Sequence, residues 1–402
     1  MYKLLVISID ELWLKGKNRP AYFRAIKKHV VDVLTHYQDE VIPIKNEEQR
    51  LICTSEKGFN QDAILALQKV PGLHSIQPSR AIDLDLEKII DEVDLELASM
   101  REMPRTFKVI TKRTNKRFPH NSMEISRYIG HLILKKLPQY KLVVDVHKPQ
   151  LVVSLKVSDQ HIYIATKTYP GIGGQPFNTS GHLITLLSGG FDSPVASFLM
   201  NKRGCRQTYL FFYAYPFVGQ NVLDKILKLV GILGQYQNGS KLYVLPFGEF
   251  QKELSDHIKP DYRTLFFRKY MLEAAALLKS RLKADAIITG DVLSQVSSQT
   301  IGNLAIVDQL TPAMVLRPLI GFNKSEIIEI SRKINTHDIS TIPHDDACAM
   351  FAPKHPVLRP DPEYFLSFAK ENQVKYEVLL NQVLDQAGIY QISIDGKINQ
   401  LN

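Results

Sequence analysis

The sequence predicts a multidomain α/β protein whose last part is a doubly wound parallel sheet. The 402 residues are too many for one small fold, so two or three domains are expected. Beyond residue 182, short apolar runs alternate regularly with helical periods, a pattern typical of parallel strands covered by helices on both faces. A Gly- and Pro-rich stretch at 168–177 separates this part from a mixed α+β part and indicates the main domain boundary.

The first part of the chain is expected to form small α+β units. Hydrophobic periodicity predicts a strand at 2–9, a helix at 19–36, a strand pair near 41–54, a helix at 60–69 and a strand at 74–81. The following segments predict a helix at 86–100, a strand at 106–112, a helix at 122–137 and three short strands in 141–166. We expect domains at 1–60 and 61–167, a linker at 168–182 and a last domain at 183–402.

The last part alternates strands and helices as a parallel sheet requires. Strands are predicted at 183–187, 207–213, 241–246 and 285–289. Helices are predicted at 194–203, 220–234, 249–257 and 262–281. A helix near 363–383 and a short tail are expected after them, and no internal repeat is visible.

Composition excludes several classes of protein. A hydrophobic content of 45% with 23% charged residues excludes a disordered or fibrous chain. No apolar run is long enough to span a membrane, and the short run at the start is closed by Asp10 and Glu11, so neither a membrane span nor a signal peptide is expected. The three cysteines form no Cys-x-x-Cys pair, which disfavours a disulfide framework or a cysteine-based zinc site and favours a cytoplasmic location.

The net charge of +9 is concentrated in one segment. Residues 101–167 contain 14 Lys and Arg against 4 Asp and Glu, whereas the rest of the chain contains 36 against 37. The densest cluster is Lys108, Lys112, Arg113, Lys116 and Arg117. Such a face predicts a polyanion partner bound through phosphate contacts, although a solvated face without a partner fits equally well. Charge alone does not distinguish DNA, RNA and an acidic protein.

The sharpest motif is Ser188-Gly-Gly-Phe-Asp-Ser-Pro194, between the first strand and the first helix of the alternating part. Two glycines allow a close approach to an anion, Asp192 or Ser193 can cap the helix, and Pro194 suits its first turn. Loop amides and the helix dipole would then face a phosphate, and Asp192 would bind Mg²⁺ that bridges to a triphosphate. The motif lacks the lysine of a Walker loop, and a chance Ser-Gly-Gly turn is the alternative.

This loop resembles that of the PP-loop ATP pyrophosphatases, whose defining motif is Ser-Gly-Gly-x-Asp-Ser. Nearly the whole chain is similar, more closely, to the tRNA sulfurtransferases, or tRNA 4-thiouridine synthetases. The matching stretches are Leu14-Lys-Gly-Lys-Asn-Arg19, Phe107-Lys-Val with Lys112-Arg113 and Phe118-Pro119, Val144-Asp-Val-His147, Tyr169-Pro-Gly-Ile-Gly-Gly174, Thr289-Gly-Asp291, Gln295-Val-Ser-Ser-Gln-Thr300, Leu316-Arg-Pro-Leu-Ile-Gly321 and Phe351-Ala-Pro-Lys-His-Pro356.

The resemblance implies a ferredoxin-like N-terminal domain, a THUMP RNA-binding domain and a PP-loop domain of the adenine nucleotide alpha hydrolase-like kind. It implies an enzyme that uses ATP and Mg²⁺ to adenylate a tRNA uridine, uridine 8, at O4, with release of pyrophosphate and AMP. Sulfur from a cysteine persulfide then replaces the oxygen and gives 4-thiouridine. The implied partners are tRNA, a cysteine desulfurase and a second copy of the chain in a homodimer.

The resemblance also assigns site residues. ATP binding falls on Leu186, Leu187, Ser188, Gly189, Gly190, Asp192, Ser193, Phe211, Phe212, Arg268, Gly290 and Gln299, and Asp192 is expected to be catalytic and to hold Mg²⁺ through ATP. The expected tRNA-binding residues are Lys15, Lys17, Arg19, Lys108, Lys112, Arg113, Lys116 and Arg117. By composition, the two phenylalanines fit buried strand positions equally well, and Lys269 could replace Arg268 as the contact. Arg317 matches a family arginine without an assigned role.

Cys348 is the expected sulfur-carrying residue. A sulfur carrier must be a reactive thiolate, and His344, Lys354 or His355 could lower its pKa, whereas Asp345 and Asp346 would act the other way. A metal site with the two histidines and an inert core cysteine are the alternatives. Cys205 lies twelve residues beyond Ser193 and is a poor second candidate, and Cys53 is expected to be buried in a strand.

Some members of the family carry a rhodanese domain whose cysteine delivers the persulfide. About forty residues follow the expected PP-loop domain, too few for another domain, so the desulfurase is expected to load Cys348 directly. The family's second role, sulfur supply for the thiamine thiazole, depends on the rhodanese domain in members that have it. Two alternatives stay open: another PP-loop tRNA enzyme (2-thiolating, lysidine-type or amidating), and a non-catalytic RNA-binding THUMP protein.

Overall fold

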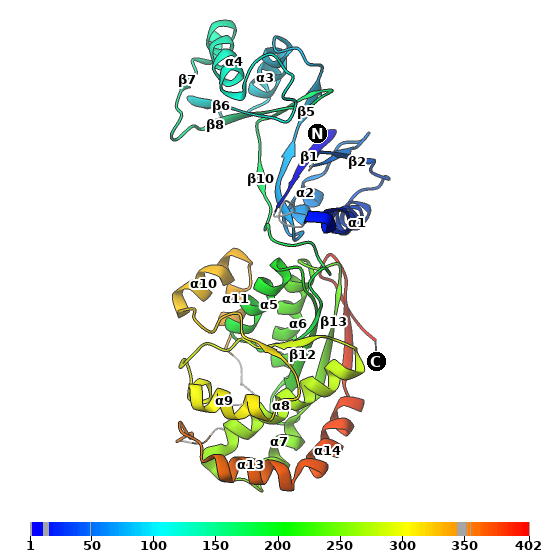
Figure 1. The fold of residues 1–402 in the computed structure, drawn as a ribbon, viewed down its shortest axis with the longest axis vertical. Coiled ribbons are helices and arrows are strands. Elements are labelled where there is room, and N and C mark those ends of the chain that lie inside the picture. Colours follow the sequence, from blue (N-terminus) through cyan, green and yellow to red (C-terminus); the bar gives the residue numbers. More distant parts are fainter. Residues whose placement is uncertain are drawn as a thin grey trace. The chain divides into compact units, whose positions relative to one another are not determined.

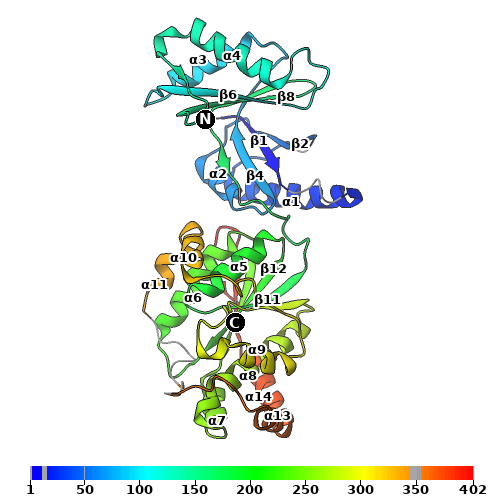
Figure 2. The ribbon, with the colours of Figure 1, turned by 60° about the vertical axis from the view of Figure 1, so that its left-hand side comes forward.

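The computed structural model describes residues 2–10, 16–48, 50–343, 351, 353 and 355–401. The chain forms two compact units, Met1–Gly174 and Gln175–Asn402, and the division falls inside the expected linker. Figures 1 and 2 show the elements of each unit from two directions. Each unit has its own buried core, and each is described separately below.

The first unit begins with a five-stranded sheet in the order β10-β4-β1-β3-β2. Its strands are β1 (Leu4–Ile9), β2 (Ile44–Glu47), β3 (Arg50–Thr54), β4 (Leu73–Pro78) and β10 (Tyr169–Pro170). Helices α1 (Arg19–Tyr37) and α2 (Gln61–Gln68) pack against each other and bury apolar side chains such as Ile26 and Leu67. Because β4 belongs to this sheet and α2 packs against β4, the elements of this part extend past the boundary expected at residue 60.

A second five-stranded sheet follows in the order β5-β9-β8-β6-β7. Its strands are β5 (Arg80–Ile82), β6 (Thr106–Arg113), β7 (Val143–Val144), β8 (Leu151–Val157) and β9 (Ile162–Ala165). Helices α3 (Lys88–Ala98) and α4 (Ser122–Lys136) cover one face of it, as Figure 2 shows. The strand expected at 74–81 is in fact two strands in different sheets, because the chain crosses between the sheets at Ser79, which is buried.

The second unit is built on a seven-stranded sheet in the order β15-β14-β11-β12-β13-β16-β17. Its strands are β11 (His182–Leu186), β12 (Arg206–Tyr213), β13 (Ser240–Pro246), β14 (Ala286–Ile288), β15 (Val315–Leu316), β16 (Gly388–Ile392) and β17 (Ile398–Gln400). The first five are parallel to one another, whereas β16 is antiparallel to β13 and β17 is antiparallel to β16. From β11 the chain proceeds outward through β12 and β13 and then returns to the other side of β11 for β14. The order therefore reverses between β11 and β14.

Helices cover both faces of this sheet, which confirms the expected doubly wound fold. Its helices are α5 (Asp192–Lys202), α6 (Gln220–Gly234), α7 (Gly248–Ser255), α8 (Arg263–Arg281), α9 (Ile301–Gln309), α10 (Lys324–Lys333), α11 (His337–Thr341), α13 (Pro362–Glu371) and α14 (Gln373–Asp385). In β12, Leu210 and Phe212 pack into the cluster that contains α8 and α14, whereas Tyr209 and Phe211 pack into the cluster that contains α6. Successive strand residues thus serve two cores.

The end of the chain differs from the expectation of one helix and a short tail. Residues 362–385 form two helices, and residues 388–400 form the hairpin β16–β17, which extends the parallel sheet in the antiparallel direction. Ile392 is fully buried in the α6 cluster, so the hairpin belongs to the core. The two strands are only five and three residues long, too short for hydrophobic periodicity to reveal them in the sequence.

Replacing Ile392 tests the contribution of the hairpin. Ile392→Ala removes a fully buried side chain from the α6 cluster, so we expect a loss of about 2–5 kcal/mol in the free energy of unfolding, measured in urea. The control Val374→Ala changes a side chain that is 77% exposed and should cost less than about 0.5 kcal/mol. Equal small effects of the two substitutions would contradict the core position of the hairpin.

Candidate functional site

A cavity of about 420 Å³ lies at the carboxyl ends of the central strands, where the strand order reverses. Open α/β sheets bind ligands at this position. Its lining includes Leu186, Leu187, Ser188, Gly189, Asp192, Ser193, Phe211, Phe212, Arg268, Gly290, Asp291 and Gln299. Of the residues expected to bind ATP, all but Gly190 therefore line one cavity.

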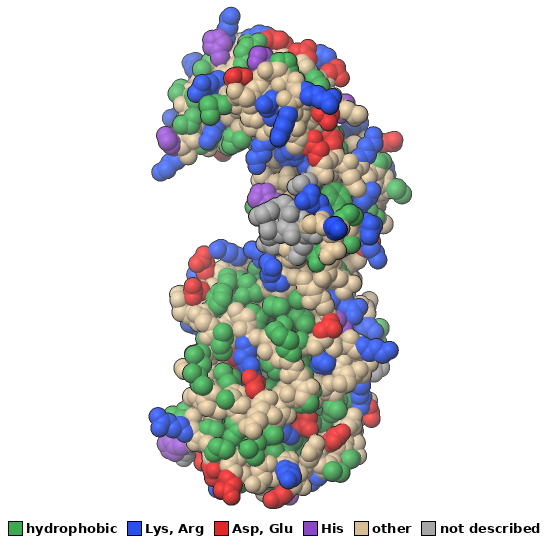
Figure 3. Space-filling view, in the orientation of Figure 1, with side chains coloured by type: hydrophobic (Ala, Val, Ile, Leu, Met, Phe, Trp, Pro, Cys, Tyr) green, Lys and Arg blue, Asp and Glu red, His purple; other side chains and the backbone are tan. Residues whose placement is uncertain are grey.

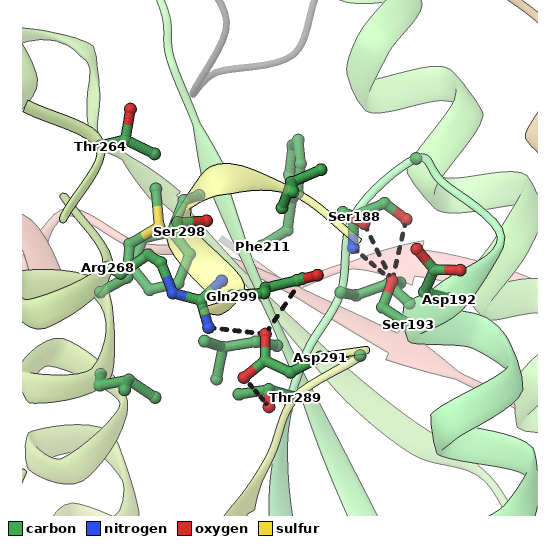
Figure 4. A pocket seen from close by; sticks show the side chains of 18 of the residues that line it. Ser188, Asp192, Ser193, Phe211, Thr264, Arg268, Thr289, Asp291, Ser298 and Gln299 are labelled. Carbon is green, nitrogen blue, oxygen red and sulfur yellow. Dashed lines mark hydrogen bonds and ion pairs between the residues drawn. The ribbon is translucent and has the colours of Figure 1, made fainter. Parts of the chain in front are cut away.

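The loop between β11 and α5 is fixed by Ser193. Its hydroxyl oxygen accepts a hydrogen bond from the Ser188 amide at 2.8 Å and lies 3.1 Å from the Ser188 hydroxyl (Figure 4). Helix α5 begins at Asp192 without a side-chain cap, so the expectation that Asp192 or Ser193 caps the helix was wrong. Ser193 instead ties the start of the loop to its end, and Pro194 lies in the first turn of the helix as expected.

The glycine after β14 permits the close approach of two segments. A Cβ atom on Gly290 would lie 2.7 Å from the Ser193 amide nitrogen and 2.9 Å from the Asp192 carbonyl carbon, both backbone atoms. A side chain at this position would therefore push the loop and the start of α5 away from β14. By contrast, the nearest atom to a Cβ on Gly190 would be the Ser188 hydroxyl at 3.7 Å, an ordinary contact.

Asp192 faces two polar side chains from later in the chain. Its carboxylate accepts hydrogen bonds from Lys324 Nζ at 2.9 Å and from Gln295 Nε2 at 2.8 Å. The Lys324 ammonium also lies 5.1 Å from the centre of the Phe191 ring. The expectations from the sequence included neither Lys324 nor Gln295, and the match of Gln295-Val-Ser-Ser-Gln-Thr300 to the family was the available signal.

On the other side of the cavity, Asp291 bridges two arginines. Its carboxylate is 4% exposed and accepts hydrogen bonds from Arg268 Nη2 at 2.6 Å and Arg317 Nε at 3.0 Å. Thr289 donates a third at 2.8 Å. Burial alone would raise the pKa of Asp291, but the Arg268 guanidinium and these hydrogen bonds outweigh it and hold the pKa below its ordinary value. Asp291 is therefore charged at neutral pH, although it was not among the expected site residues.

Two buried polar atoms in the cavity have no hydrogen-bond partner among the described residues. They are Arg268 Nε, a donor, and Gln299 Oε1, an acceptor. Buried polar groups are nearly always satisfied, so hydrogen bonding is incomplete at these two atoms, whose side chains belong to the cavity wall. Lys269, the alternative to Arg268, is buried away from the cavity, where it pairs with Glu273 and lies over the Tyr270 ring.

Phe211 and Phe212 are each 6% exposed and both line the cavity. They serve both as strand residues in the two cores and as cavity wall. Thr264 and Ser298 place hydroxyl groups at the end of the cavity away from the Ser188 loop, as Figure 4 shows. The cavity thus has an apolar wall between a loop rich in amide donors and a wall with Arg268.

Cys53 and Cys205 are buried in the structure. Burial raises the pKa of the Cys53 thiol to about 12 and that of Cys205 to about 11, and the Cys205 thiol donates to the Ser180 carbonyl at 3.4 Å. Neither lines the cavity. Cys348, with His344, Asp345, Asp346 and Lys354, lies outside the described residues.

The chain on either side of residues 344–350 is anchored beside the cavity. Lys225 Nζ donates to the carbonyl oxygens of Ser340 and Ile342 at 3.0 and 2.7 Å, and the Ser340 hydroxyl donates to the Gly190 carbonyl at 3.2 Å. After the segment, Phe351 packs against Phe217 and Phe267.

The expected tRNA-binding cations lie in the first unit. Lys108, Lys112 and Arg113 are on β6, and Lys116 and Arg117 are exposed in the loop that follows. Figure 3 shows Lys and Arg side chains on the face of this unit that is in view. Lys17 is exposed just before α1, and Arg19 begins that helix, whereas Lys15 lies outside the described residues.

Within the described part of the chain, no group of three or more His, Cys, Asp and Glu side chains could hold a metal ion. No helix there has the length and apolar character to cross a membrane.

Three family models match successive parts of the chain. The model described as "ThiI ferredoxin-like domain" matches residues 4–77, the THUMP domain model matches 84–167, and the model described as "Thiamine biosynthesis protein (ThiI)" matches 178–374. The first two cover most of the two sheets of the first unit, and the third covers most of the second unit.

Related proteins match over almost their whole length. A probable tRNA sulfurtransferase of Brevibacillus brevis is 32% identical over 396 residues, which are 98% of both chains. Another, of Thermoanaerobacter pseudethanolicus, is 36% identical over 90% of this chain and 93% of its own. Among solved structures, a 4-thiouridine synthetase in complex with RNA and bound ATP matches with a TM-score of 0.84 and 28% identity, over 98% of this chain and 100% of that one.

Gly290→Ala tests the close approach of β14 to the loop. The added Cβ would lie within 3 Å of backbone atoms of Asp192 and Ser193, so we expect a loss of about 1–3 kcal/mol in the free energy of unfolding, measured in urea. Gly321→Ala is the matched control, because nothing lies within 4 Å of its Cβ position. Wild-type stability of Gly290→Ala would contradict the geometry at this contact.

Because the Cys53 and Cys205 thiols are buried, we expect both to react slowly with an alkylating reagent. In a Cys348→Ser variant at pH 8, only about one Cys205 thiol in a thousand would be ionised, given its pKa of about 11, and fewer at Cys53. We expect almost no alkylation by iodoacetamide in the folded protein and labelling of both thiols after unfolding, measured by mass spectrometry. Rising pH should speed the reaction, because the thiolate is the nucleophile. Rapid labelling of the folded variant would show that one of the two thiols is accessible.

Proposed function

This chain belongs to the ThiI family of tRNA sulfurtransferases, and from this premise we propose that it is an ATP-dependent enzyme that converts a tRNA uridine, uridine 8, into 4-thiouridine. The observation that carries the proposal is the cavity at the reversal of strand order, where the Ser188–Ser193 loop faces Arg268. This arrangement suits a nucleotide with its phosphates on the loop.

ATP fits the polarity of this cavity. Loop amides and the positive end of the α5 dipole would face the phosphates. The close contact at Gly290 holds the end of this loop against β14. Arg268 and Gln299 line the cavity, each has one buried polar atom without a partner among the described residues, and both side chains would offer hydrogen bonds to the nucleotide. Phe211 and Phe212 would supply apolar contact area for the base. The resemblance to a 4-thiouridine synthetase that binds ATP supports the same ligand.

Mg²⁺ would be held mainly by the phosphates, with Asp192 as the protein carboxylate. Such sites use one or two carboxylates together with substrate phosphates, and Asp192 is the carboxylate on the loop. The bound ion would supply charge neutralisation for the departing pyrophosphate. Lys324, which now pairs with Asp192, lies close enough to share that task.

We propose that the reaction proceeds in two stages. Uridine O4 attacks the α-phosphorus of ATP, pyrophosphate leaves, and Arg268 with the loop amides stabilises the developing charge. The terminal sulfur of a Cys348 persulfide then attacks C4 of the adenylated base, and AMP leaves with the former O4. A thiol reductant cleaves the sulfur–sulfur bond, which returns the Cys348 thiol and leaves 4-thiouridine. A base inside a helix must first leave its stack, at a cost of a few kcal/mol.

The anchored flanks support Cys348 as the sulfur carrier. Ser340 bonds the Gly190 carbonyl on one side, and Phe351 is packed on the other. The other cysteines are buried, with raised pKa values, so neither offers a reactive thiolate.

The partners follow from the same proposal. The basic residues of β6 and its loop would bind the tRNA backbone, since phosphate contacts dominate affinity for nucleic acids. The related RNA complex supports an RNA partner. A cysteine desulfurase would supply the persulfide, and a homodimer would let one copy hold the tRNA that another modifies. Sulfur supply for the thiamine thiazole is a further role of the family that the ThiI name suggests.

Replacing Cys348 tests the proposed function. Cys348→Ala should abolish 4-thiouridine formation, with a loss of at least about a thousandfold, because no other thiol can carry the sulfur. Binding of an ATP analogue should stay unchanged. Cys205→Ala is the matched control, since its thiol is buried outside the cavity, and it should thiolate tRNA at nearly the wild-type rate.

The measurement is mass analysis of nucleosides from unmodified tRNA after incubation with protein, ATP, Mg²⁺, a cysteine desulfurase with cysteine, and a thiol reductant. Wild-type levels of 4-thiouridine with Cys348→Ala would refute the role of this residue. Absence of 4-thiouridine with the wild-type protein, or another thiolated nucleoside in its place, would refute the proposed function.

A further inference from the structure

We propose that Asp291 is a positioning residue that aims Arg268 and Gln299 at the nucleotide. Asp291 lines the cavity and is almost inaccessible to solvent. The two stages of the reaction leave it without a chemical task, and the inference rests on the proposed function, because it concerns how that site binds ATP.

The Oδ1 atom of Asp291 orients both nucleotide-facing side chains. It accepts from Arg268 Nη2 at 2.6 Å and lies 3.5 Å from Gln299 Nε2 (Figure 4). A carboxylate only accepts hydrogen bonds, so it attracts the nitrogen of the Gln299 amide and leaves Oε1 directed elsewhere. The same bond leaves Arg268 Nε without a partner among the described residues. One oxygen thus sets the orientation of two side chains in the cavity wall.

The Oδ2 atom keeps the carboxylate fixed when Arg268 engages a ligand. Arg317 Nε and the Thr289 hydroxyl donate to it at 3.0 and 2.8 Å. Arg317 also forms two hydrogen bonds to Asp308, at 2.5 and 2.9 Å, so its own position is held from outside the cavity. Arg317, which the resemblance left without a role, therefore serves as the second counter-charge of Asp291.

This arrangement needs the negative charge of Asp291. Without it, Arg268 and Arg317 would be close, partly buried and uncompensated on this side, which is strongly unfavourable. The lowered pKa of Asp291 agrees with the requirement, since the carboxylate stays ionised throughout the neutral range. Removing the charge of Asp291 should change the orientation of Arg268 and should affect the rest of the sheet less.

Asp291→Asn tests the proposal through ATP binding. With a non-hydrolysable ATP analogue and Mg²⁺, we expect the dissociation constant measured by calorimetry to rise at least about tenfold, as loss of an orienting charged hydrogen bond implies. Asp385→Asn is the matched control: it breaks the Arg281–Asp385 pair, which lies outside the cavity and shares no partner with Asp291, and should change the constant by less than about twofold. Thermal unfolding checks that each variant is folded.

A double-mutant cycle separates positioning from general support. If Asp291 acts through Arg268, Asp291→Asn should weaken binding by less than about threefold when added to Arg268→Ala. Full multiplication of the two single effects, or wild-type affinity of Asp291→Asn, would overturn the proposal.

Should Asp291→Asn fail to fold, Asp291→Glu decides the question, because it keeps the charge but moves the carboxylate by one methylene. We expect a similar loss of affinity, and wild-type affinity would overturn the proposal. A wild-type protein that binds no ATP analogue would instead refute the proposed function, so the two failures are distinguishable.

Discussion

The second unit depends on one steric constraint, the close approach of the end of β14 to the start of α5. Gly290 lies so near the backbone of Asp192 and Ser193 that no side chain fits between them. The approach occurs where the chain, having gone outward from β11 through β12 and β13, returns on the other side. Because β11 and β14 are parallel neighbours, their carboxyl ends lie next to each other there. The loop that follows β11 and Asp291, which follows β14, therefore line a single cavity.

Side-chain bonds then keep the parts around this contact in place. Ser193 ties the loop to its own beginning, and Lys225 holds the chain that precedes residues 344–350. Each of these uses a buried polar group whose partner is a backbone atom, so a change in one would move backbone as well as side chain. The geometry of the cavity is thus a property of the surrounding elements more than of the lining side chains alone.

The sequence predicted the strand, loop and helix of the phosphate-type motif, because turn residues and periodicity act over short distances. It also predicted that Cys53 is buried, since a cysteine inside a strand needs no distant partner. Ser193 was different, because its hydroxyl bonds to Ser188 rather than capping the helix, and only the closed loop reveals that choice.

Asp291 and Lys324 were missed for a related reason. The partners of Asp291 lie 23 and 26 residues away, and Lys324 is 132 residues from Asp192. Such pairs follow from strand order, which local patterns do not encode. The hairpin β16–β17 was missed because its strands are only five and three residues long, although Ile392 is part of the core. The position of Cys348 relative to the cavity stays a prediction.

The charges around Asp291 and the cations of β6 and its loop differ in how strongly they respond to ionic strength. The four charges around Asp291 cancel, two arginines against two aspartates, and most of them are shielded from solvent, so dissolved salt has little field there to screen. The cations of β6 and its loop are mostly exposed and face counterions directly. Added salt therefore screens the cations of the first unit at concentrations that leave the charges around the cavity of the second unit almost unaffected.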